Sequence, residues 1–406
     1  MKATIIAVGE EVLRQEVKNT NTEYLATSLM ESGVDLVQTV VVGDVETDIL
    51  NALRLASSSS DLIITIGGLG PTPDDLTRET VAKFLGLEMA FVQETADRID
   101  QLFAKRGMAT PQINYRQAYA PKGCMVLSND FGTAPGLMIS DMGKTFIILP
   151  GPPRELVPIW ENEVLPRLTA KEKTFKRDFH VFGLTESETA QRTERLMKSQ
   201  TQPFVAPYAG IGDIRLRVWA RADSQEEFET LVKPAIDEMF EKLSPYLFDN
   251  PIEIELGIKL KKMGWTISTA ESCTGGLISK TITDAPGSSA YLMGNAVTYS
   301  NQAKMKLLGV NPETLEKFGA VSEQTALEMV QGCAKLFGTD CAISTTGIAG
   351  PDGGTADKPV GLVYIGILTP KGAKIFRQIF SGTRQDVRHR TLMFALTQLL
   401  LDITKE

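Results

Sequence analysis

Ser272 has the sequence setting in this chain that best suits chemistry. It lies in residues 270–276, Ala-Glu-Ser-Cys-Thr-Gly-Gly, where a predicted strand gives way to a predicted helix. A serine hydroxyl needs an adjacent base before it acts as a nucleophile. The chain has two histidines, and neither lies near Ser272 or in the polar segment at residues 298–304. Lys304 or Tyr299, both in that segment, is therefore the expected activator.

Each of these residues also has an ordinary structural explanation. Ser272 could cap the following helix, Tyr299 could be a core aromatic residue, and Lys304 could be a solvated surface lysine. To act as a base, Lys304 must be neutral. Its pKa must then fall by roughly three units from about 10.4, which costs on the order of 4 kcal/mol and requires burial or nearby positive charge. Cys273 is the competing nucleophile, but no histidine lies beside it to stabilise a thiolate.

Glycines and arginines around these residues predict a site for an anionic substrate. Glycines 275 and 276 would let the backbone approach a ligand closely, and amides of the following helix could donate to an oxyanion. The glycine-rich loop at residues 347–354 offers further backbone amides. Arginines that open the last helix could clamp a phosphate or remain solvated surface charges. The expected substrate-binding residues are Thr274, Gly275, Gly276, Gly350, Gly353, Gly354, Arg384 and Arg388.

The overall composition argues against several classes of protein. The chain is 43% apolar and 23% charged, which is ordinary for a globular protein. Its net charge of -8 argues against a general nucleic-acid-binding protein. The four cysteines form no Cys-x-x-Cys pair, so neither a structural zinc site nor a disulfide framework is expected. No apolar run has the length of a signal-peptide core or a membrane span. We therefore expect a cytoplasmic protein without membrane contact.

The length and pattern of the chain predict several domains. At 406 residues it is too long for one ordinary core. Strands and helices alternate through the first part, as in an open α/β domain. A half-exposed strand at 214–218 and an amphipathic helix at 226–243 indicate a small α+β unit, and residues 249–251 mark a boundary before a further α/β domain. The expected organisation is a multidomain α/β protein with domains at 1–169, 170–248 and 249–406.

A glycine-rich turn in the first domain predicts a second site. Residues 67–77, Gly-Gly-Leu-Gly-Pro-Thr-Pro-Asp-Asp-Leu-Thr, directly follow a continuously apolar strand at 62–66. In open α/β sheets, ligands bind beyond the carboxyl ends of the strands. Glycine amides and carboxylates at that edge suit a phosphorylated ligand bridged by a hard cation. The alternative is a plain turn in which Asp74 or Asp75 caps the next helix.

Residues 252–404 resemble the carboxy-terminal domain of the competence/damage-inducible CinA family. The resemblance rests on residues 270–276, 298–304, 307–310, 319–322 and 346–361. It implies a nicotinamide-nucleotide amidase, which hydrolyses the carboxamide of nicotinamide mononucleotide (NMN) to give nicotinate mononucleotide and ammonia. The resemblance also implies that Ser272 is the acyl-forming nucleophile, Lys304 the general base and Tyr299 its partner, with no cofactor.

Residues 3–168 resemble the molybdopterin-binding-like domain of the same family, and the middle segment resembles its KH-like linker domain. The motifs that carry these resemblances are residues 19–21, 42–44, 67–77, 132–136, 149–155 and 182–187. The first resemblance implies an ADP-ribose pyrophosphatase that uses Mg²⁺, Mn²⁺ or Co²⁺. The implied site residues are Glu11, Asn21, Gly67, Gly68, Gly70, Asp75, Gly151 and Pro152, with Asp75 and Glu11 as metal ligands.

One motif of the first domain departs from the family pattern, which reads Gly-Thr-Glu-Leu, two leucines and a glycine. Residues 9–15 here read Gly-Glu-Glu-Val-Leu-Arg-Gln. Glu10 is expected to repel a diphosphate, and Gln15 to remove a backbone conformation that needed glycine. The alternative function is therefore a catalytically silent module that binds a nucleotide, a pterin or a protein partner in competence. A homodimer is also expected, because the arginines near residue 384 need a destination.

Overall fold

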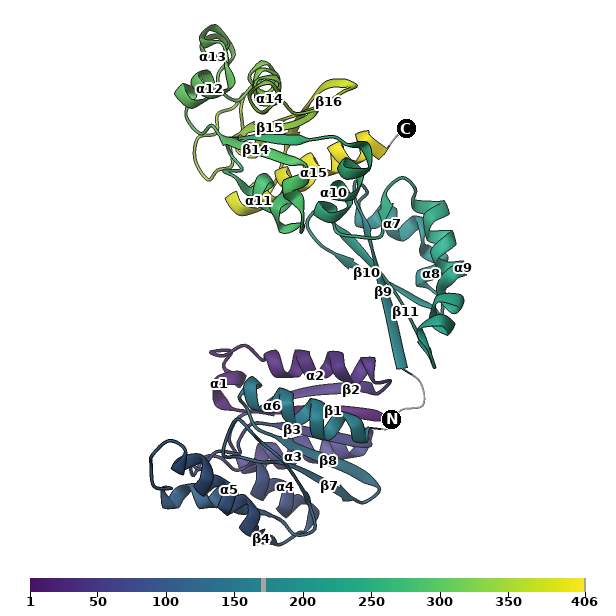
Figure 1. Ribbon diagram of the computed structural model, residues 1–406. Coiled ribbons are helices and arrows are strands. Elements are labelled where there is room, and N and C mark those ends of the chain that lie inside the picture. Colours follow the sequence, from purple (N-terminus) through teal and green to yellow (C-terminus); the bar gives the residue numbers. More distant parts are fainter. Residues whose placement is uncertain (169–172, 405–406) are drawn as a thin grey trace. The chain divides into compact units, whose positions relative to one another are not determined.

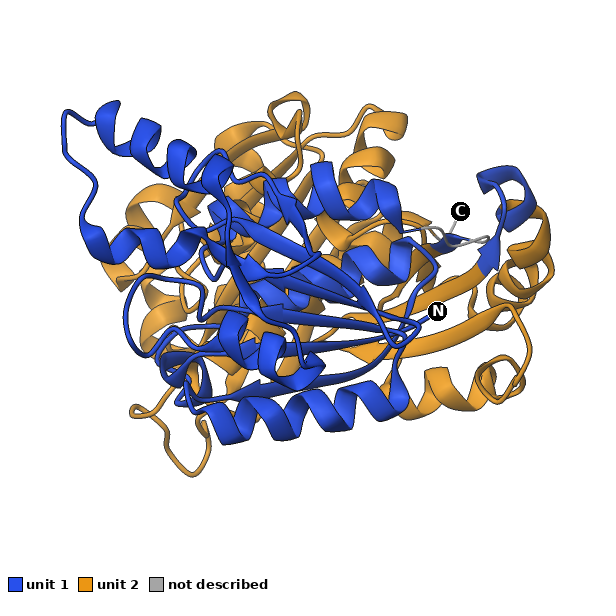
Figure 2. Ribbon diagram, turned by 90° about the horizontal axis from the view of Figure 1, so that it is seen from below, with its two compact units in different colours: residues 1–175, 221–228 blue, residues 176–220, 229–406 orange. Residues whose placement is uncertain are grey.

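The computed structural model describes residues 1–168 and 173–404. Contacts divide the chain into two compact units (Figure 2), made of residues 1–175 with 221–228 and of residues 176–220 with 229–406. The expected domain boundary between residues 169 and 170 lies outside the described residues. Each unit contains one of the two predicted sites.

The first unit is built on a six-stranded sheet. Its strands are β1 (Lys2–Val8), β2 (Asp35–Val42), β3 (Leu62–Ile66), β6 (Met125–Leu127), β7 (Gly136–Asp141) and β8 (Lys144–Leu149). Their order is β2-β1-β3-β8-β7-β6, with β2, β1, β3 and β8 parallel and β7 antiparallel to both neighbours (Figure 1). β3 is buried along its whole length, as the apolar run at 62–66 predicts for a strand covered on both faces. A separate antiparallel pair joins β4 (Met89–Phe91) and β5 (Tyr119–Pro121).

Helices cover both faces of this sheet (Figure 1). They are α1 (Glu10–Leu13), α2 (Thr20–Glu31), α3 (Glu46–Ser59), α4 (Thr77–Leu85), α5 (Gln93–Ala104) and α6 (Pro153–Ile159), with the short 3-10 helix η1 (Gln112–Ala118). Leu25 of α2 and Leu156 of α6 lie in the core on one face. Leu53 of α3 and Val81 of α4 lie in the core on the other face. The two apolar layers hold the sheet rigid, so its strand ends have fixed positions.

The middle segment is a small α+β unit. Its strands are β9 (Lys173–Val181), β10 (Phe204–Ala209), β11 (Ile214–Ala222) and β12 (Leu247–Phe248), in the order β10-β11-β9-β12. Its helices are α7 (Glu186–Arg192), α8 (Glu194–Met197) and α9 (Gln225–Leu243). β11 alternates buried and half-buried residues, as the 214–218 pattern predicts. Phe182 and Phe248 share a core cluster with the carboxy-terminal segment, and the middle segment belongs to the second unit except for residues 173–175 and 221–228.

The carboxy-terminal segment has a five-stranded sheet in the order β14-β13-β15-β16-β17. The strands are β13 (Ile267–Glu271), β14 (Leu292–Val297), β15 (Cys341–Gly347), β16 (Leu362–Thr369) and β17 (Gly372–Ile379). β14, β13 and β15 are parallel, and the last two are antiparallel. The helices are α10 (Ile252–Met263), α11 (Leu277–Asp284), α12 (Asn301–Leu308), α13 (Pro312–Phe318), α14 (Glu323–Phe337) and α15 (Arg384–Thr404). Apolar residues of α10, α11 and α15 share one core cluster, and those of α12 and α14 share another.

The sequence predicts neither a disulfide framework nor a membrane span. All four cysteines are free, and three of them are buried. Among the residues that the structure describes, no helix combines the length and the apolar character needed to cross a bilayer.

Candidate functional sites

The carboxyl ends of three parallel strands carry the predicted residues of the second unit. Ser272 directly follows β13, Thr298 and Tyr299 follow β14, and the glycine-rich loop follows β15. Parallel strands end at the same edge of a sheet, so these segments gather there. The backbone N–H of Ser272 donates to the carbonyl of Thr345 at 3.0 Å, which ties the serine to β15.

Lys304 contacts Ser272 directly. Its Nζ lies 3.1 Å from Oγ of Ser272 and donates to the carbonyl of Thr298 at 2.7 Å. Lys304 is only 1% exposed, so it is not a solvated surface lysine. Burial lowers its pKa below the ordinary value, and a thiolate at Cys273 would act in the opposite direction. In the described part of the chain, Nζ of Lys304 forms no ion pair with a carboxylate.

Cys273 is poorly suited to be the nucleophile. The side chain is buried, and burial raises the pKa of its thiol to about 12. Near neutral pH it is therefore a thiol rather than a thiolate, and only the thiolate attacks carbonyl carbon well. Near neutral pH, Cys273 therefore carries no negative charge that would raise the pKa of Lys304.

A carboxylate of the chain itself takes the helix amides that were expected to bind an anion. Glu271 is fully buried and accepts from the backbone N–H groups of Gly276, Ile278 and Ser279 at 2.9, 3.1 and 2.9 Å. The N-cap residue of α11 is Gly276, so the alternative in which Ser272 caps that helix is wrong. The amide of Gly276 is likewise unavailable to a substrate. β13 reads Ile-Ser-Thr-Ala-Glu, so no local pattern marks its last residue as a buried, amide-bound carboxylate.

The Tyr299 hydroxyl bonds an arginine, and within the described residues no hydrogen bond joins it to Lys304. The side chain of Tyr299 is 63% exposed, which excludes a core role, and its hydroxyl accepts from Nη2 of Arg384 at 3.0 Å. Nη1 of Arg384 donates to the carbonyl of Gly350, and Nη2 of Arg388 donates to that of Thr274, both at 2.8 Å. The structure thus joins four predicted substrate-binding residues. Both arginines find partners within one chain, so they no longer argue for a homodimer.

The remaining predicted glycines are exposed. Gly275 and Gly353 have φ values of +62° and +89°, a left-handed backbone that favours glycine. Both are exposed, as is Gly354. A Cβ on Gly275 would lie 3.7 Å from Nη2 of Arg388, so backbone and guanidinium are neighbours on the open side of the serine turn.

All eight residues predicted for the amino-terminal site line one cavity of about 600 Å³ in the first unit. The cavity lies at the carboxyl ends of β1, β3 and β8, as expected for an open α/β sheet. Asn21 donates to the carbonyl of Gly151 at 2.6 Å, which joins two of the predicted segments. A Cβ on Gly67 would lie 2.3 Å from the carbonyl oxygen of Val8, so only glycine fits there. The lining residues from the prediction are Glu11, Asn21, Gly67, Gly68, Gly70, Asp75, Gly151 and Pro152.

The wall of this cavity is acidic. Glu11, Asp44, Asp74 and Asp75 all line it. Burial raises the pKa of Asp44, a hydrogen bond from the backbone of Glu10 opposes that rise, and the charges of the other three carboxylates add to it. Within the described ranges, no group of three or more histidine, cysteine or acidic side chains is placed to hold a metal ion. The predicted pair of metal ligands therefore does not form a complete protein cage.

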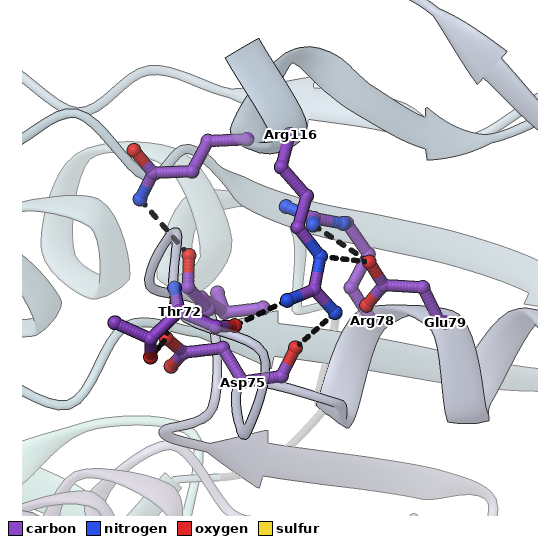
Figure 3. Close-up of polar contacts among 7 residues, drawn as sticks. Thr72, Asp75, Arg78, Glu79 and Arg116 are labelled. Carbon is purple, nitrogen blue, oxygen red and sulfur yellow. Dashed lines mark hydrogen bonds and ion pairs between the residues drawn. The ribbon is translucent and has the colours of Figure 1, made fainter. Parts of the chain in front are cut away.

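The loop that carries Asp75 is fixed by an arginine (Figure 3). Arg116, on η1, donates to the carbonyls of Thr72 and Asp75 and to the carboxylate of Glu79. Glu79 also pairs with the buried Arg78 at 3.0 Å. Oδ2 of Asp75 accepts from the N–H of Thr72 at 2.9 Å and from its hydroxyl. One carboxylate oxygen of Asp75 is thus engaged in the turn. No local pattern links the distant Arg116 to this loop.

One of the two expected effects of the unusual first motif is wrong. Glu10 pairs with Arg14 at 2.8 Å and does not line the cavity, and its repulsion of a diphosphate, which a bound cation would offset, stays a prediction. Gln15 adopts φ +60°, so the left-handed backbone is kept despite the missing glycine. The chain accepts a strain on the order of 1 kcal/mol at that position.

The fold and the two sites define a multidomain α/β protein in which a buried lysine contacts a serine at a sheet edge. The model of the CinA C-terminal domain matches residues 249–403, the "Probable molybdopterin binding domain" matches 4–170, and the "Damage-inducible protein CinA KH domain" matches 176–248. The chain belongs to the CinA family, which confirms the resemblance and the expected fold class.

Several relatives are similar to this chain over nearly its whole length. A CinA-like protein from Kosmotoga olearia is 44% identical over 98% of this chain and 97% of its own. A CinA-like protein from Dictyoglomus thermophilum is 42% identical over 98% of both chains. The crystal structure of competence/damage inducible protein CihA from Agrobacterium tumefaciens is 40% identical, covers 38% of this chain and 98% of its own, and has a TM-score of 0.36.

Proposed function

We propose that the carboxy-terminal site is a serine–lysine amidase that hydrolyses the carboxamide of NMN. The observation that carries the proposal is the contact of 3.1 Å between Nζ of the buried Lys304 and Oγ of Ser272. This distance lies within the range in which a general base takes a proton from a nucleophile. Burial favours the neutral amine that such a base requires.

The proposed reaction has two stages. Neutral Lys304 accepts the hydroxyl proton of Ser272 while Oγ attacks the carboxamide carbon. The protonated lysine then gives that proton to the leaving nitrogen, so ammonia departs and a nicotinoyl ester remains on the serine. In the second stage the lysine takes a proton from water, the resulting hydroxide cleaves the ester to nicotinate mononucleotide, and the lysine returns the proton to Oγ of Ser272. Backbone N–H groups that directly follow the nucleophile, those of Cys273 and Thr274, are the proposed oxyanion donors.

The two arginines at the start of α15 are proposed to bind the phosphate of the mononucleotide. Arg384 and Arg388 are four positions apart and so lie on one face of the helix. Arg388 contacts the turn that follows Ser272, and Arg384 contacts the glycine-rich loop. A guanidinium has five N–H donors, so each arginine keeps donors for phosphate oxygens beyond its bonds to the chain.

The test is release of ammonia from NMN by the purified protein. Ser272→Ala and Lys304→Ala should each abolish it, whereas Cys273→Ala should retain most of it. Cys273→Ala is the matched control because it removes the neighbouring thiol without touching the serine–lysine contact. Retained ammonia release in both the serine and the lysine variants would sink the amidase proposal.

We propose a second activity for the amino-terminal cavity, hydrolysis of the diphosphate of ADP-ribose. The specific observation is that all eight predicted residues line one cavity, in which burial and the charges of Glu11, Asp74 and Asp75 raise the pKa of Asp44. Glu11 and Asp75 would supply oxygen ligands to a divalent cation, which would offset the charge of the diphosphate. Two carboxylates suit a cation such as Mg²⁺, which usually completes its shell with substrate phosphates and water.

The competing function for this cavity is binding without turnover. Incubation with ADP-ribose and Mg²⁺, Mn²⁺ or Co²⁺ should yield AMP and ribose 5-phosphate, and calorimetry should show binding. Heat of binding with no products in any of the three metals would instead identify a silent nucleotide-binding module. Asp75→Asn serves as the control, because it should suppress products while the amidase stays intact.

A further inference from the structure

Glu271 is the one fully buried carboxylate next to the proposed nucleophile. It closes β13, and the following residue is Ser272. Its two carboxylate oxygens accept from three backbone N–H groups, those of Gly276, Ile278 and Ser279. These amides lie at the start of α11, where the helix dipole stabilises negative charge. The carboxylate is thereby stabilised by the backbone.

The bonds of Glu271 enclose the turn that contains the nucleophile. The backbone N–H of Ser272 is tied to Thr345 at one end, and the N–H of Gly276 is tied to the Glu271 carboxylate at the other. Gly275 and Gly276 have φ values of +62° and +95°, so the turn is sharp and backbone-determined. Removing either tie would let the turn relax and carry the serine hydroxyl with it.

The same residue is linked to the proposed base through the backbone. The carbonyl of Glu271 accepts from the N–H of Thr298 at 2.8 Å. The carbonyl of Thr298 in turn accepts from Nζ of Lys304 at 2.7 Å. The Glu271 side chain therefore holds the turn after the nucleophile, while its main chain fixes the strand end that holds the base. Glu271 therefore positions both Ser272 and Lys304, the two residues of the 3.1 Å contact.

The Glu271 side chain bonds the amides of α11 and not the base. Its oxygens accept from the N–H groups of residues 276, 278 and 279, whereas Nζ of Lys304 contacts Ser272 and the carbonyl of Thr298. Burial lowers the pKa of Lys304, and burial followed by the charge of Glu271 raises the pKa of the Cys273 thiol. Loss of the Glu271 carboxylate should therefore change the geometry of the serine rather than the pH at which the lysine becomes active.

We propose that Glu271 is a positioning residue for the serine–lysine reaction. It acts through the amides of residues 276, 278 and 279, which fix the turn and so keep the Ser272 hydroxyl in contact with Lys304. The inference rests on the proposed function of that pair. It also assigns the amino end of α11 to the protein's own carboxylate, so the substrate phosphate is left to the arginines of α15.

The test measures the reactivity of the serine itself. Phenylmethylsulfonyl fluoride would transfer its sulfonyl group to Oγ of Ser272, with loss of fluoride and of the hydroxyl proton, and mass spectrometry would count the modified serine. Glu271→Gln keeps the size of the side chain but turns an N–H donor toward the helix amides. Labelling should slow by about 10²-fold, as expected for a nucleophile displaced by roughly 1 Å, with its pH midpoint unchanged. In ammonia release, kcat should fall similarly while KM stays within about twofold.

Asn311→Ala is the matched control for simple loss of a helix cap. Asn311 caps α13 in the same domain by accepting from the N–H of Glu313 at 3.0 Å, away from the serine turn. Its removal should cost about 1 kcal/mol of stability and leave labelling unchanged. Glu271→Asp, which keeps the charge on a shorter side chain, replaces the glutamine variant if the latter does not fold.

The outcomes separate this inference from the amidase proposal. Wild-type labelling rates in a folded Glu271 variant would overturn the positioning role and leave the serine–lysine pair standing. A slow rate accompanied by a shifted pH midpoint would also overturn it, because the carboxylate would then act on the base. If the wild-type protein neither releases ammonia from NMN nor is labelled at Ser272, the amidase proposal itself fails, and the positioning role fails with it.

Discussion

The two sites lie at the same kind of sheet edge but treat buried charge in opposite ways. In the carboxy-terminal site, the Glu271 carboxylate is stabilised by three helix amides, and the neighbouring Lys304 is buried without a carboxylate partner in the described structure. In the amino-terminal cavity, burial raises the pKa of Asp44, and the charges of Glu11, Asp74 and Asp75 add to that rise. In the carboxy-terminal site, the buried carboxylate thus has its hydrogen-bond partners within the protein before a substrate binds. The amino-terminal cavity leaves negative charge that a cation and a ligand would have to offset.

This difference explains why the sites suit different chemistry. A desolvated lysine beside a hydroxyl is a ready-made base and nucleophile, and it needs only a carbonyl carbon in reach. An acidic cavity with a glycine-lined floor has no such pair, but it suits a phosphorylated ligand that brings a divalent cation. Fold alone does not distinguish the two cases, because both sites use the carboxyl ends of parallel strands.

The largest predicted effect comes from substituting Lys304 in one site and Asp75 in the other. Lys304→Met should reduce ammonia release from NMN by about 10³-fold, as removal of a general base does, and should leave products from ADP-ribose unchanged. Asp75→Asn should show the reverse pattern. Both activities are to be measured on the same preparations of each variant. A fall of both activities in either variant would show that the sites are coupled or that the variant is misfolded, and circular dichroism separates these outcomes.

The pH dependence of the amidase should sharpen the same contrast. The base must be deprotonated, so activity falls as pH drops through the pKa of Lys304, which burial places below its ordinary value of 10.5. Below that pKa, kcat/KM should fall about tenfold per pH unit. The Cys273 thiol, with a pKa raised to about 12, should leave no inflection at lower pH. Identical pH curves for the wild-type protein and Lys304→Met would assign the inflection to another group.

A smaller effect is expected at Tyr299. Its hydroxyl contacts Arg384 rather than Lys304, so Tyr299→Phe should reduce kcat/KM by less than tenfold, chiefly through KM. Arg384→Lys is the companion variant, because it keeps the charge but loses the planar fork that bonds both Tyr299 and Gly350. A loss of 10²-fold or more in kcat for Tyr299→Phe would restore the tyrosine as a partner of the base.

Local patterns predicted the site residues better than they predicted the partners of those residues. Ser272 follows a predicted strand and the 67–77 turn follows a continuously apolar one, so their place at a sheet edge could be predicted from the sequence. The burial of Lys304 could not, because a lysine four residues into an amphipathic helix has no signal that separates buried from exposed. The role of Arg116 depends on η1 lying against the Thr72 turn, a contact set by tertiary packing. Likewise, Tyr299 was assigned by proximity in sequence, whereas its partner lies 85 positions away.

The smallest predicted effect tests how closely the amino-terminal cavity keeps its backbone without the usual glycine. Gln15 holds a left-handed φ of +60°, which costs a side-chain-bearing residue on the order of 1 kcal/mol, while glycine loses more entropy on folding. Gln15→Gly should therefore raise the free energy of unfolding by only about 0.5 kcal/mol in urea titrations, because the two effects partly cancel. Met142→Gly is the matched control, since Met142 has φ +51° in the turn between β7 and β8 and does not line the cavity.

Equal stabilisation in both variants, with ADP-ribose binding unchanged, would show that Gln15 strains the backbone without altering the site. Tighter binding in Gln15→Gly alone would show instead that the lost glycine weakens this cavity, and so widens its difference from the preassembled serine–lysine site.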